Sequence, residues 1–436
     1  MDAFLIEGGT PLNGSVAVNG SKNASLPILA AALLTDDPIT IHDIPDLADI
    51  ANLKRLLTEL GTDITEQPGS LTLHTTDTSN SHARYDIVKT MRASICVLGP
   101  LLAKRGFARV SLPGGCAIGD RPVDLHLRGL EALGAHISVE AGDIIATTPR
   151  QGLIGTKLFL GGPNGPTVLG TANVMCAATL AKGTTIIEAA ACEPEVADLA
   201  KLLTAMGAHI SGAGTPRITI QGVPSLHTAT HTVIPDRIEA ATLMIAAAIS
   251  QGRVTVQNCP VDALLAVIDM LTRAGVAIQP SDPAANITDV TVTTRGPLRP
   301  VQITTQPHPG FPTDVQAQTM ALLSLAAGNS VITERIFPER FLHVAELARM
   351  GAQLYRQAST VVVSGVPELR GAPVMASDLR ASASLVLAAI AAQGATTISR
   401  VYHLDRGYEQ LETRLNAIGA NIQRVDQRAV SPVAAL

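Results

Sequence analysis

The stretch LADIANLKRLLTELG (residues 47–61) has the pattern of an amphipathic helix that ends at a glycine. Leu57 stands four residues before Gly61, which is helical spacing, and glycine readily takes the left-handed conformation that closes a helix. Five further stretches share a Leu four residues before a Gly: 122–134, 195–207, 261–275, 340–351 and 407–419. Their closing glycines follow at spacings of 73, 73, 68, 76 and 68 residues. So long a period predicts a repeated supersecondary unit.

A second, more apolar helix that leads into a strand opens each repeat. Examples are KNASLPILAAALLTDDPITIHDI (22–44), TANVMCAATLAKGTTIIEAA (171–190), DRIEAATLMIAAAISQGRVTVQN (236–258) and DLRASASLVLAAIAAQGATTISRV (378–401). After the Gly-ended helices, alternating stretches such as HISVEAGDIIATTP (136–149) predict a hairpin. The repeat is therefore a strand, a helix, a strand, a helix and a hairpin, which gives an α/β fold. We expect the apolar helices to be buried among sheets and the Gly-ended helices to lie further out.

Composition and charge argue against several classes of protein. The chain has 436 residues, of which 46% are hydrophobic and 16% charged, with a formal net charge of -5. This charge argues against a nucleic-acid or membrane partner held by a basic face. The apolar runs at 26–34 and 384–392 are too short to span a membrane. The N-terminus resembles no signal peptide, and the five cysteines form no CxxC pair, so we expect a cytoplasmic protein without disulfides or a metal site.

Charged residues at the starts of the apolar helices argue against a purely structural solenoid. They are Lys22, Arg92, Arg237, Asp314 and Arg380. Packing does not require charges there, and cations at helix N-termini add to the positive field of the helix dipole. Several such helix ends that converge on one cleft would bind an anion. We therefore favour an anion-binding protein.

A lone cysteine in a glycine-rich segment points to chemistry. Cys116 lies in SLPGGCAIGDRPVD (111–124), after two glycines and before an Asp-Arg-Pro turn. A free cysteine more often lies in a core as a small apolar residue. Glycines give the backbone conformational freedom, so this cysteine is placed where a substrate can reach it.

Seven motifs, in order along nearly the whole chain, resemble one family. They are NGSKNASLPILAAAL (19–33), KTMRASI (89–95), LPGGCAIGDRPVDLH (112–126), IPDRIEA (234–240), HPGFPTDVQAQ (308–318), DLRASASLVLA (378–388) and YHLDRGYEQLE (402–412). Together they resemble the UDP-N-acetylglucosamine 1-carboxyvinyltransferase family of enolpyruvyl transferases. The resemblance implies two inside-out α/β barrel domains of three βαβαββ units each, with the active site in the cleft between them. The implied domains are residues 22–233 and a discontinuous one of residues 1–21 and 234–436, which the N-terminal strand closes.

The reaction that the resemblance implies moves the enolpyruvyl group of phosphoenolpyruvate to the 3′-hydroxyl of UDP-N-acetylglucosamine. It proceeds by addition and elimination, releases phosphate, and is the first committed step of peptidoglycan synthesis in the bacterial cytoplasm. Such a site needs an acid, a base and cations for phosphate and carboxylate. The resemblance implies no cofactor, no metal, no nucleic acid, no membrane and no obligate protein partner.

The family's functional residues match positions of this chain. By resemblance, Cys116 is the acid, forms a 2-(S-cysteinyl)pyruvate adduct and reacts with fosfomycin, Asp314 is the base, and Lys22 and Arg406 are also catalytic. The positions that match phosphoenolpyruvate contacts are Lys22, Asn23, Arg121, Arg340, Arg380 and Arg406. The positions that match UDP-N-acetylglucosamine contacts are Arg92, Arg121, Pro122, Val123, Asp124, Leu125, Asp314 and Ile336. Asp378 is expected to orient Arg380 and the substrate.

Structural alternatives remain for two of these residues, and two segments depart from the family pattern. Asp314 has the alternative of a helix N-cap, and Arg406 that of a salt bridge with Asp405. Residues 167–169 read Thr-Val-Leu where the family commonly has Ser-Val-Gly, which puts nucleotide contacts there in doubt. Residues 338–340 read Pro-Glu-Arg where the family has Glu-Asn-Arg.

Two other functions compete with this hypothesis. A sister enolpyruvyl transferase acts on shikimate 3-phosphate with the same fold and reaction, but it lacks the cysteine loop and the UDP-binding residues matched here. A non-catalytic paralogue that binds the UDP-sugar without turnover is the second alternative. The intact residues Lys22, Cys116, Asp314, Arg340, Arg380 and Arg406 argue against it.

Overall fold

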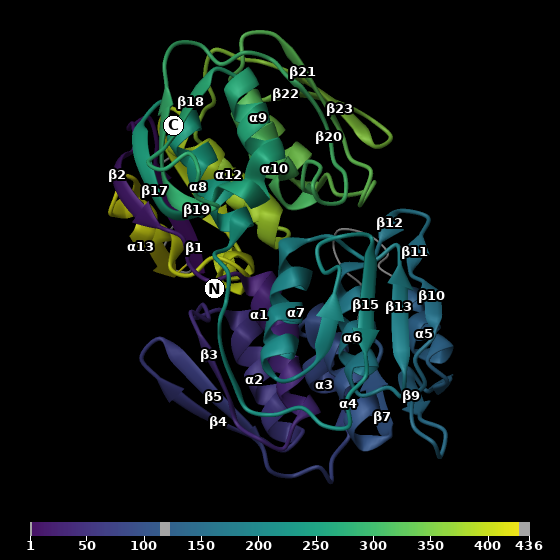
Figure 1. Ribbon diagram of the computed structural model, residues 1–436. Helices are drawn as coiled ribbons and strands as arrows, with labels where there is room; N and C mark the ends of the chain where they lie inside the picture. The colour runs from purple at the N-terminus through teal and green to yellow at the C-terminus, as the bar shows by residue number, and fades with distance from the viewer. Residues whose placement is uncertain (1, 114–122, 427–436) are drawn as a thin grey trace. The chain divides into compact units, whose positions relative to one another are not determined.

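The computed structural model describes residues 2–113 and 123–426, which fall into two compact units (Figure 1). Residues 20–113 and 123–234 form one, here called the middle unit. Residues 2–19 and 235–426 form the other, here called the terminal unit. Cys116, Arg121 and Pro122 lie outside the described residues. No helix in the described part of the chain is long and apolar enough to cross a membrane.

The middle unit carries three repeats, each with a four-stranded sheet. Its helices, with 3-10 helices marked η, are α1 (Lys22–Ala30), η1 (Ala31–Leu34), α2 (Ala48–Glu59), α3 (Tyr85–Val88), η2 (Arg92–Val97), α4 (Leu98–Arg105), α5 (Asp124–Ala132), α6 (Val168–Thr179) and α7 (Pro194–Ala205). Its strands are β3 (Ile39–His42), β4 (Thr62–Gln67), β5 (Ser70–Thr75), β6 (His82–Ala83), β7 (Phe107–Ser111), β8 (His136–Glu140), β9 (Asp143–Thr147), β10 (Lys157–Phe159), β11 (Gly161–Gly162), β12 (Gly165–Pro166), β13 (Thr184–Glu188), β14 (His209–Ser211), β15 (Arg217–Gln221) and β16 (Ala229–Thr232). Among these, the four-stranded sheets have the orders β16-β3-β5-β4, β6-β7-β9-β8 and β10-β13-β15-β14.

The terminal unit carries three further repeats of the same kind. Its helices are α8 (Arg237–Ile249), η3 (Val261–Leu264), α9 (Leu265–Arg273), η4 (Thr313–Val315), α10 (Gln316–Leu323), α11 (Leu342–Arg349), α12 (Leu379–Ala391), η5 (Val401–Arg406) and α13 (Leu411–Asn416). Its strands are β1 (Asp2–Glu7), β2 (Asn13–Ala17), β17 (Arg253–Pro260), β18 (Val276–Pro280), β19 (Ile287–Thr294), β20 (Gln302–Thr304), β21 (Asn329–Thr333), β22 (Gln353–Gln357), β23 (Thr360–Ser364), β24 (Pro373–Met375), β25 (Ala395–Ser399) and β26 (Asn421–Asp426). The described sheets here have the orders β18-β19-β17-β2, β20-β21-β23-β22 and β24-β25-β1-β26.

The predicted helix ends are confirmed. All six closing glycines, at 61, 134, 207, 275, 351 and 419, take a φ between +88° and +106°. This left-handed conformation strains residues that have a Cβ, which is why glycine ends each of these helices. The Leu four residues earlier is buried in every repeat.

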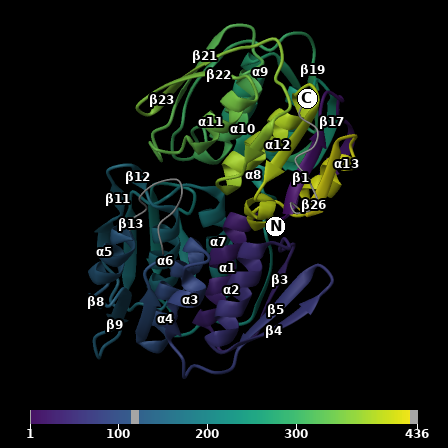
Figure 2. The same ribbon diagram turned by 180° about the vertical axis from the view of Figure 1, so that it is seen from behind.

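The apolar helices are buried, as the sequence predicts. Every residue of α8 and of α10 is buried, whereas α2 buries five of its twelve residues. In the terminal unit α8, α10 and α12 pack side by side, with β21, β22 and β23 on one side of them and β1 and β26 on the other (Figure 2). An α/β fold with mixed sheets around buried helices is therefore the architecture of each unit.

Two strands do not join the sheet of the helix that follows them. β2 directly precedes α1 in the chain but pairs in parallel with β17 of the terminal unit. β16 directly precedes α8 but pairs in parallel with β3 of the middle unit. Within these two repeats the predicted order of a strand followed by a helix therefore holds along the chain, but the strand belongs to a sheet of the other unit. Parallel pairing needs a long crossover, and here the crossover spans most of a unit.

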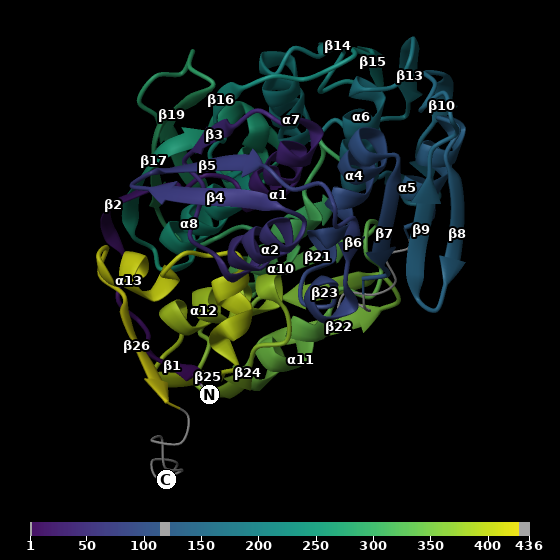
Figure 3. The ribbon, with the colours of Figure 1, turned by 90° about the horizontal axis from the view of Figure 1, so that it is seen from below.

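The last repeat also differs from the predicted pattern, because its hairpin is divided. Only β26 follows α13 within the described residues, and β1 takes the place of the second hairpin strand. β1 is antiparallel to both neighbours, so that Phe4 lies opposite Ile398 of β25 and Arg424 of β26 (Figure 3). The expectation that the N-terminal strand closes the second domain agrees with this pairing.

Candidate active site

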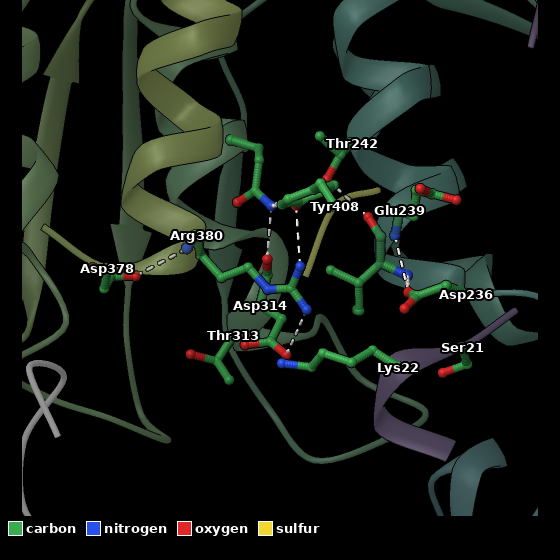
Figure 4. Close-up of polar contacts among 12 residues, drawn as sticks. Ser21, Lys22, Asp236, Glu239, Thr242, Thr313, Asp314, Asp378, Arg380 and Tyr408 are labelled. Carbon is green, nitrogen blue, oxygen red and sulfur yellow. Dashed lines mark hydrogen bonds and ion pairs between the residues drawn. The ribbon is translucent and has the colours of Figure 1, made fainter. Parts of the chain in front are cut away.

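Asp314 pairs with two arginines inside the terminal unit. Its Oδ1 accepts a hydrogen bond from Nη1 of Arg340 at 2.8 Å. Its Oδ2 lies 3.4 Å from Nη2 of Arg380, and Figure 4 shows this second contact. The side chains of Arg340 and Arg380 are only 6% and 4% exposed, whereas that of Asp314 is 29% exposed. Two buried guanidinium groups share one partly exposed carboxylate. Their remaining N–H donors, which lie in the plane of each guanidinium group, can bind an anionic ligand.

The local structure explains why Asp314 points at the arginines. It lies in η4, and α10 begins only at Gln316, with Val315 at its N-cap position and no side-chain cap. The alternative role of Asp314 as an N-cap is therefore wrong. Thr313, its neighbour, accepts a hydrogen bond from Nη1 of Arg340 at 3.1 Å and helps to hold that guanidinium group.

Asp378 fixes the start of α12 and with it the position of Arg380. Its side chain caps the helix, and Oδ1 accepts hydrogen bonds from the backbone N–H groups of Arg380 at 2.9 Å and Ala381 at 3.1 Å. Asp378 thus contacts Arg380 through its backbone N–H, and its expected role in orienting Arg380 and the substrate stays a prediction. Burial by itself lowers the pKa of Arg380, but the nearby Tyr408, Asp314 and Asp236 raise this pKa above its usual value, so the guanidinium group stays charged.

Glu334 is a buried carboxylate that the sequence reasoning missed. It is fully buried, and its Oε1 accepts hydrogen bonds from the hydroxyl of Thr305 at 2.7 Å and from the backbone of Ile336 at 2.8 Å and Phe337 at 2.9 Å. Its Oε2 accepts from the hydroxyl of Thr313 at 2.9 Å. Glu334 therefore shapes the segment that carries Ile336 and Arg340. The sequence did carry a signal for Glu334, because this acidic residue directly follows a stretch rich in β-branched residues, Asn329–Thr333.

His343, on α11, is a second buried group that the sequence reasoning did not single out. Burial lowers the pKa of His343 to about 4, although Asp378 raises this pKa and Arg340 lowers it further. The imidazole is therefore neutral at neutral pH. A neutral ring adds no further positive charge near Arg340.

The predicted site residues of the middle unit lie at helix starts, as expected. Lys22 is the first residue of α1, after the N-cap Ser21, and its Nζ lies 3.3 Å from Oδ2 of Asp49. Arg92 begins η2, which packs against α1. The other predicted residues here are Asn23 in the first turn of α1, and Val123, Asp124 and Leu125 at the start of α5.

Arg406, in the terminal unit, ends η5 and is half-buried. Its alternative role in a salt bridge with Asp405 is wrong, because the Asp405 carboxylate pairs with Arg424 instead. The two oxygens of Asp405 lie 3.1 Å and 2.6 Å from the guanidinium nitrogens of Arg424. Within the described residues, no group of three or more His, Cys, Asp or Glu side chains is arranged to hold a metal ion.

A family model described as EPSP synthase (3-phosphoshikimate 1-carboxyvinyltransferase) matches residues 6–415. The chain belongs to this family. Curated relatives called UDP-N-acetylglucosamine 1-carboxyvinyltransferase are similar along nearly their whole length. The one from Desulfosudis oleivorans is 51% identical and covers 98% of this chain and 100% of its own. The one from Desulfovibrio desulfuricans is 53% identical with the same coverage.

Solved structures of an enolpyruvyl transferase and of an EPSP synthase share the fold. The crystal structure of the enolpyruvyl transferase NikO from Streptomyces tendae matches with a TM-score of 0.87 and 27% identity, over 97% of this chain and 99% of that one. EPSP synthase from Acinetobacter baumannii matches with a TM-score of 0.77 but only 18% identity, over 98% and 100%, which shows the fold alone. The family assignment drawn from the seven motifs is confirmed.

The two departures from the family pattern have structural explanations. Thr167 caps α6 by accepting a hydrogen bond from the backbone of Gly170 at 3.2 Å, and Leu169 lies in the first turn of that helix. Because residue 169 takes a regular helical conformation, this position does not require glycine. Glu339 is exposed and pairs with Arg356 at 2.8 Å, so its neighbour Arg340 remains available to Asp314.

Thiol labelling at neutral pH is expected to be confined to Cys116. Three described cysteines are buried, and burial raises the pKa of Cys96 and Cys259 to about 12 and raises that of Cys176 further. Burial, with Glu193, also raises the pKa of the half-buried Cys192. Because the thiolate is the nucleophile, these four thiols react slowly. The measurement is peptide mass spectrometry after brief iodoacetamide treatment, with Cys116→Ser as the control, and labelling of Cys192 at a similar rate would contradict the expectation.

Proposed function

We propose that this protein transfers the enolpyruvyl group of phosphoenolpyruvate to the 3′-hydroxyl of UDP-N-acetylglucosamine and releases phosphate. The observation that carries the proposal is the 49–53% identity, over almost the full length, with relatives that bear the name of this activity. The identity with EPSP synthase structures is only 18–19%, so the reaction on shikimate 3-phosphate is not favoured. The proposal assigns the protein to peptidoglycan synthesis in the bacterial cytoplasm.

The geometry around Asp314 suits the attack of the sugar hydroxyl. In the proposed reaction a proton is added to C3 of phosphoenolpyruvate and the sugar oxygen attacks C2. Phosphate then leaves C2 as C3 gives up a proton, which restores the double bond of the enolpyruvyl group. Asp314 takes the hydroxyl proton, and the forks of Arg340 and Arg380 bind the substrate carboxylate. A bound carboxylate competes with Asp314 for these two cations, and a carboxylate that loses a cationic partner accepts a proton more readily.

The remaining assignments come from matched positions in both units. The phosphoryl group of phosphoenolpyruvate is assigned to Lys22, Arg121 and Arg406, with Asn23 beside it. Cys116 is assigned as the acid and as the residue that forms the covalent adduct. The UDP-sugar contacts are assigned to Arg92, Arg121, Pro122, Val123, Asp124, Leu125, Asp314 and Ile336.

The experiment that tests the proposal follows phosphate release from phosphoenolpyruvate by the purified protein. We expect release with UDP-N-acetylglucosamine and none with shikimate 3-phosphate or without an acceptor. Mass spectrometry of the nucleotide product should find the mass of an added enolpyruvyl group. Release with shikimate 3-phosphate alone would favour the sister activity, and binding of the UDP-sugar without any release would favour a non-catalytic protein.

A further inference from the structure

Three buried side chains from separate elements of the terminal unit meet behind Arg380. Tyr408 follows η5, Thr242 lies on α8 and Gln318 lies on α10, and each is at most 2% exposed. The Tyr408 hydroxyl lies 2.9 Å from Oγ1 of Thr242 and 3.3 Å from Nε2 of Gln318. Nη1 of Arg380 donates to the same hydroxyl at 3.1 Å (Figure 4). We call Thr242, Gln318 and Tyr408 the hydroxyl–amide cluster.

The donors and acceptors of this cluster set the direction of the hydrogen bonds at Tyr408. The Thr242 hydroxyl donates to the carbonyl of Ile238 at 2.8 Å, so its oxygen is left as an acceptor. Guanidinium and amide nitrogens only donate, so Arg380 donates to the oxygen of Tyr408, while one amide proton of Gln318 is shared between the oxygens of Tyr408 and Thr242. The single hydroxyl proton of Tyr408 must then go to Thr242. Arg380 thereby occupies one lone pair of Tyr408.

Gln318 connects the cluster to Asp314 as well. Its Nε2 donates to the backbone carbonyl of Asp314 at 2.8 Å and lies 3.2 Å from Oγ1 of Thr242. The amide cannot be reversed, because its oxygen would then face that carbonyl. This orientation leaves Oε1 of Gln318 buried and without a hydrogen-bond partner among the described residues. Leaving a buried amide oxygen unpaired costs free energy. The donor contacts of Nε2 must outweigh this cost, so they fix the orientation of the Gln318 amide.

The backbone allows Tyr408 to approach α12 because of the residue before it. A Cβ on Gly407 would lie 2.5 Å from Cδ2 of Leu379, the first residue of α12. The ring of Tyr408 also lies against the guanidinium group of Arg380, with 5.4 Å between Cζ and the ring centroid. Tyr408 therefore holds Arg380 through its ring face and its hydroxyl oxygen.

We propose that Tyr408, fixed by Thr242 and Gln318, is a positioning residue that aims the guanidinium group of Arg380 at the substrate carboxylate. The Tyr408 hydroxyl binds Nη1 of Arg380. Nη2 of Arg380 then points toward Asp314, where the proposed anionic ligand would also bind. This positioning role of Tyr408 depends on the proposed function in one respect, which is the identity of the anionic ligand. A cation with four rotatable bonds is otherwise free to take several orientations, so fixing it in advance strengthens binding of the reacting species.

The first test is Tyr408→Phe, which removes the hydroxyl and keeps the ring. We expect kcat/KM for phosphoenolpyruvate to fall about 10- to 100-fold, the range that corresponds to one hydrogen bond to a charged group. The KM for UDP-N-acetylglucosamine should stay within about twofold, because the change is confined to the arginine. Tyr355→Phe is the matched control, since Tyr355 is 62% exposed on β22. Equal kinetics of Tyr408→Phe and wild type would overturn the proposal.

A double-mutant cycle separates positioning from a loss of stability. In an Arg380→Lys background, Tyr408→Phe should lower kcat/KM less than about threefold. The guanidinium group that the Tyr408 hydroxyl positions is already absent in that background. The same cost in both backgrounds would mean a structural role only. If Tyr408→Phe fails to fold, Thr242→Val removes the acceptor of the tyrosine proton and should give a smaller loss, which Thr242→Ser should restore.

A measurement independent of turnover distinguishes this inference from the proposed function. The Nη–Hη resonances of Arg380, assigned by their loss in Arg380→Lys, should exchange with water at least about tenfold faster in Tyr408→Phe than in wild type, because Nη1 loses its acceptor. Unchanged exchange would overturn the positioning role even in an active enzyme. A wild-type protein with slow exchange but no phosphate release would overturn the proposed function alone.

Discussion

Asp314→Asn should lower kcat about 10²- to 10⁴-fold, the range of a general acid–base group. The amide has nearly the same size, and Asp314 caps no helix, so the fold should be retained. An amide cannot accept the hydroxyl proton, although its oxygen can still bind Arg340. The measurement is phosphate release under saturating substrates. Asp269→Asn is the control, because the Asp269 side chain is 65% exposed on α9 and pairs only along its own helix.

The kinetic pattern distinguishes a lost base from loosened arginines. The amide nitrogen of Asn would face the Nη2 of Arg380, which by itself raises the KM for phosphoenolpyruvate. A lost base lowers kcat instead. A variant that keeps kcat and shows only a raised KM would remove Asp314 from the proton transfer and leave it as a partner of the arginines.

Glu334→Gln should lower the free energy of unfolding by about 3 kcal/mol, the upper range for hydrogen bonds to a charged group. The buried carboxylate accepts four hydrogen bonds, whereas an amide presents one oxygen and turns its NH₂ group toward donors. Urea unfolding at constant slope measures the change. Glu339→Gln is the matched control, because Glu339 is 74% exposed and its replacement should change stability by less than about 0.5 kcal/mol.

The position of Arg340 should respond to the same substitution. Thr313 bridges Glu334 and Arg340, so Glu334→Gln should also weaken substrate binding. Full stability would contradict the role of Glu334 as the centre of this segment. Reduced stability with unchanged binding would limit that role to the fold.

The local features of this protein could be predicted from the sequence, and the non-local ones could not. The Gly-ended helices depend on residues only four apart, so the spacing of Leu57 and Gly61 by itself predicts where the helix ends. Asp314 and Arg380 lie in motifs with a family pattern, and Arg340 matches that pattern although its two preceding residues do not. By contrast, nothing in β2 or β16 indicates which sheet each strand joins, since strands of similar composition fit either. Thr242 and Tyr408 are 166 residues apart, and each alone looks like an ordinary buried residue.

The divided hairpin of the last repeat has a consequence for synthesis on the ribosome. β1 emerges first, but its partners β25 and β26 emerge after every other described strand. Residues 20–234 can fold as a contiguous nascent segment, while β1 waits with Phe4 and Ile6, both buried in the finished protein, exposed to water. The terminal unit therefore completes this sheet only after β26 has been synthesised, and until then the N-terminal strand has unpaired backbone edges that are prone to aggregation.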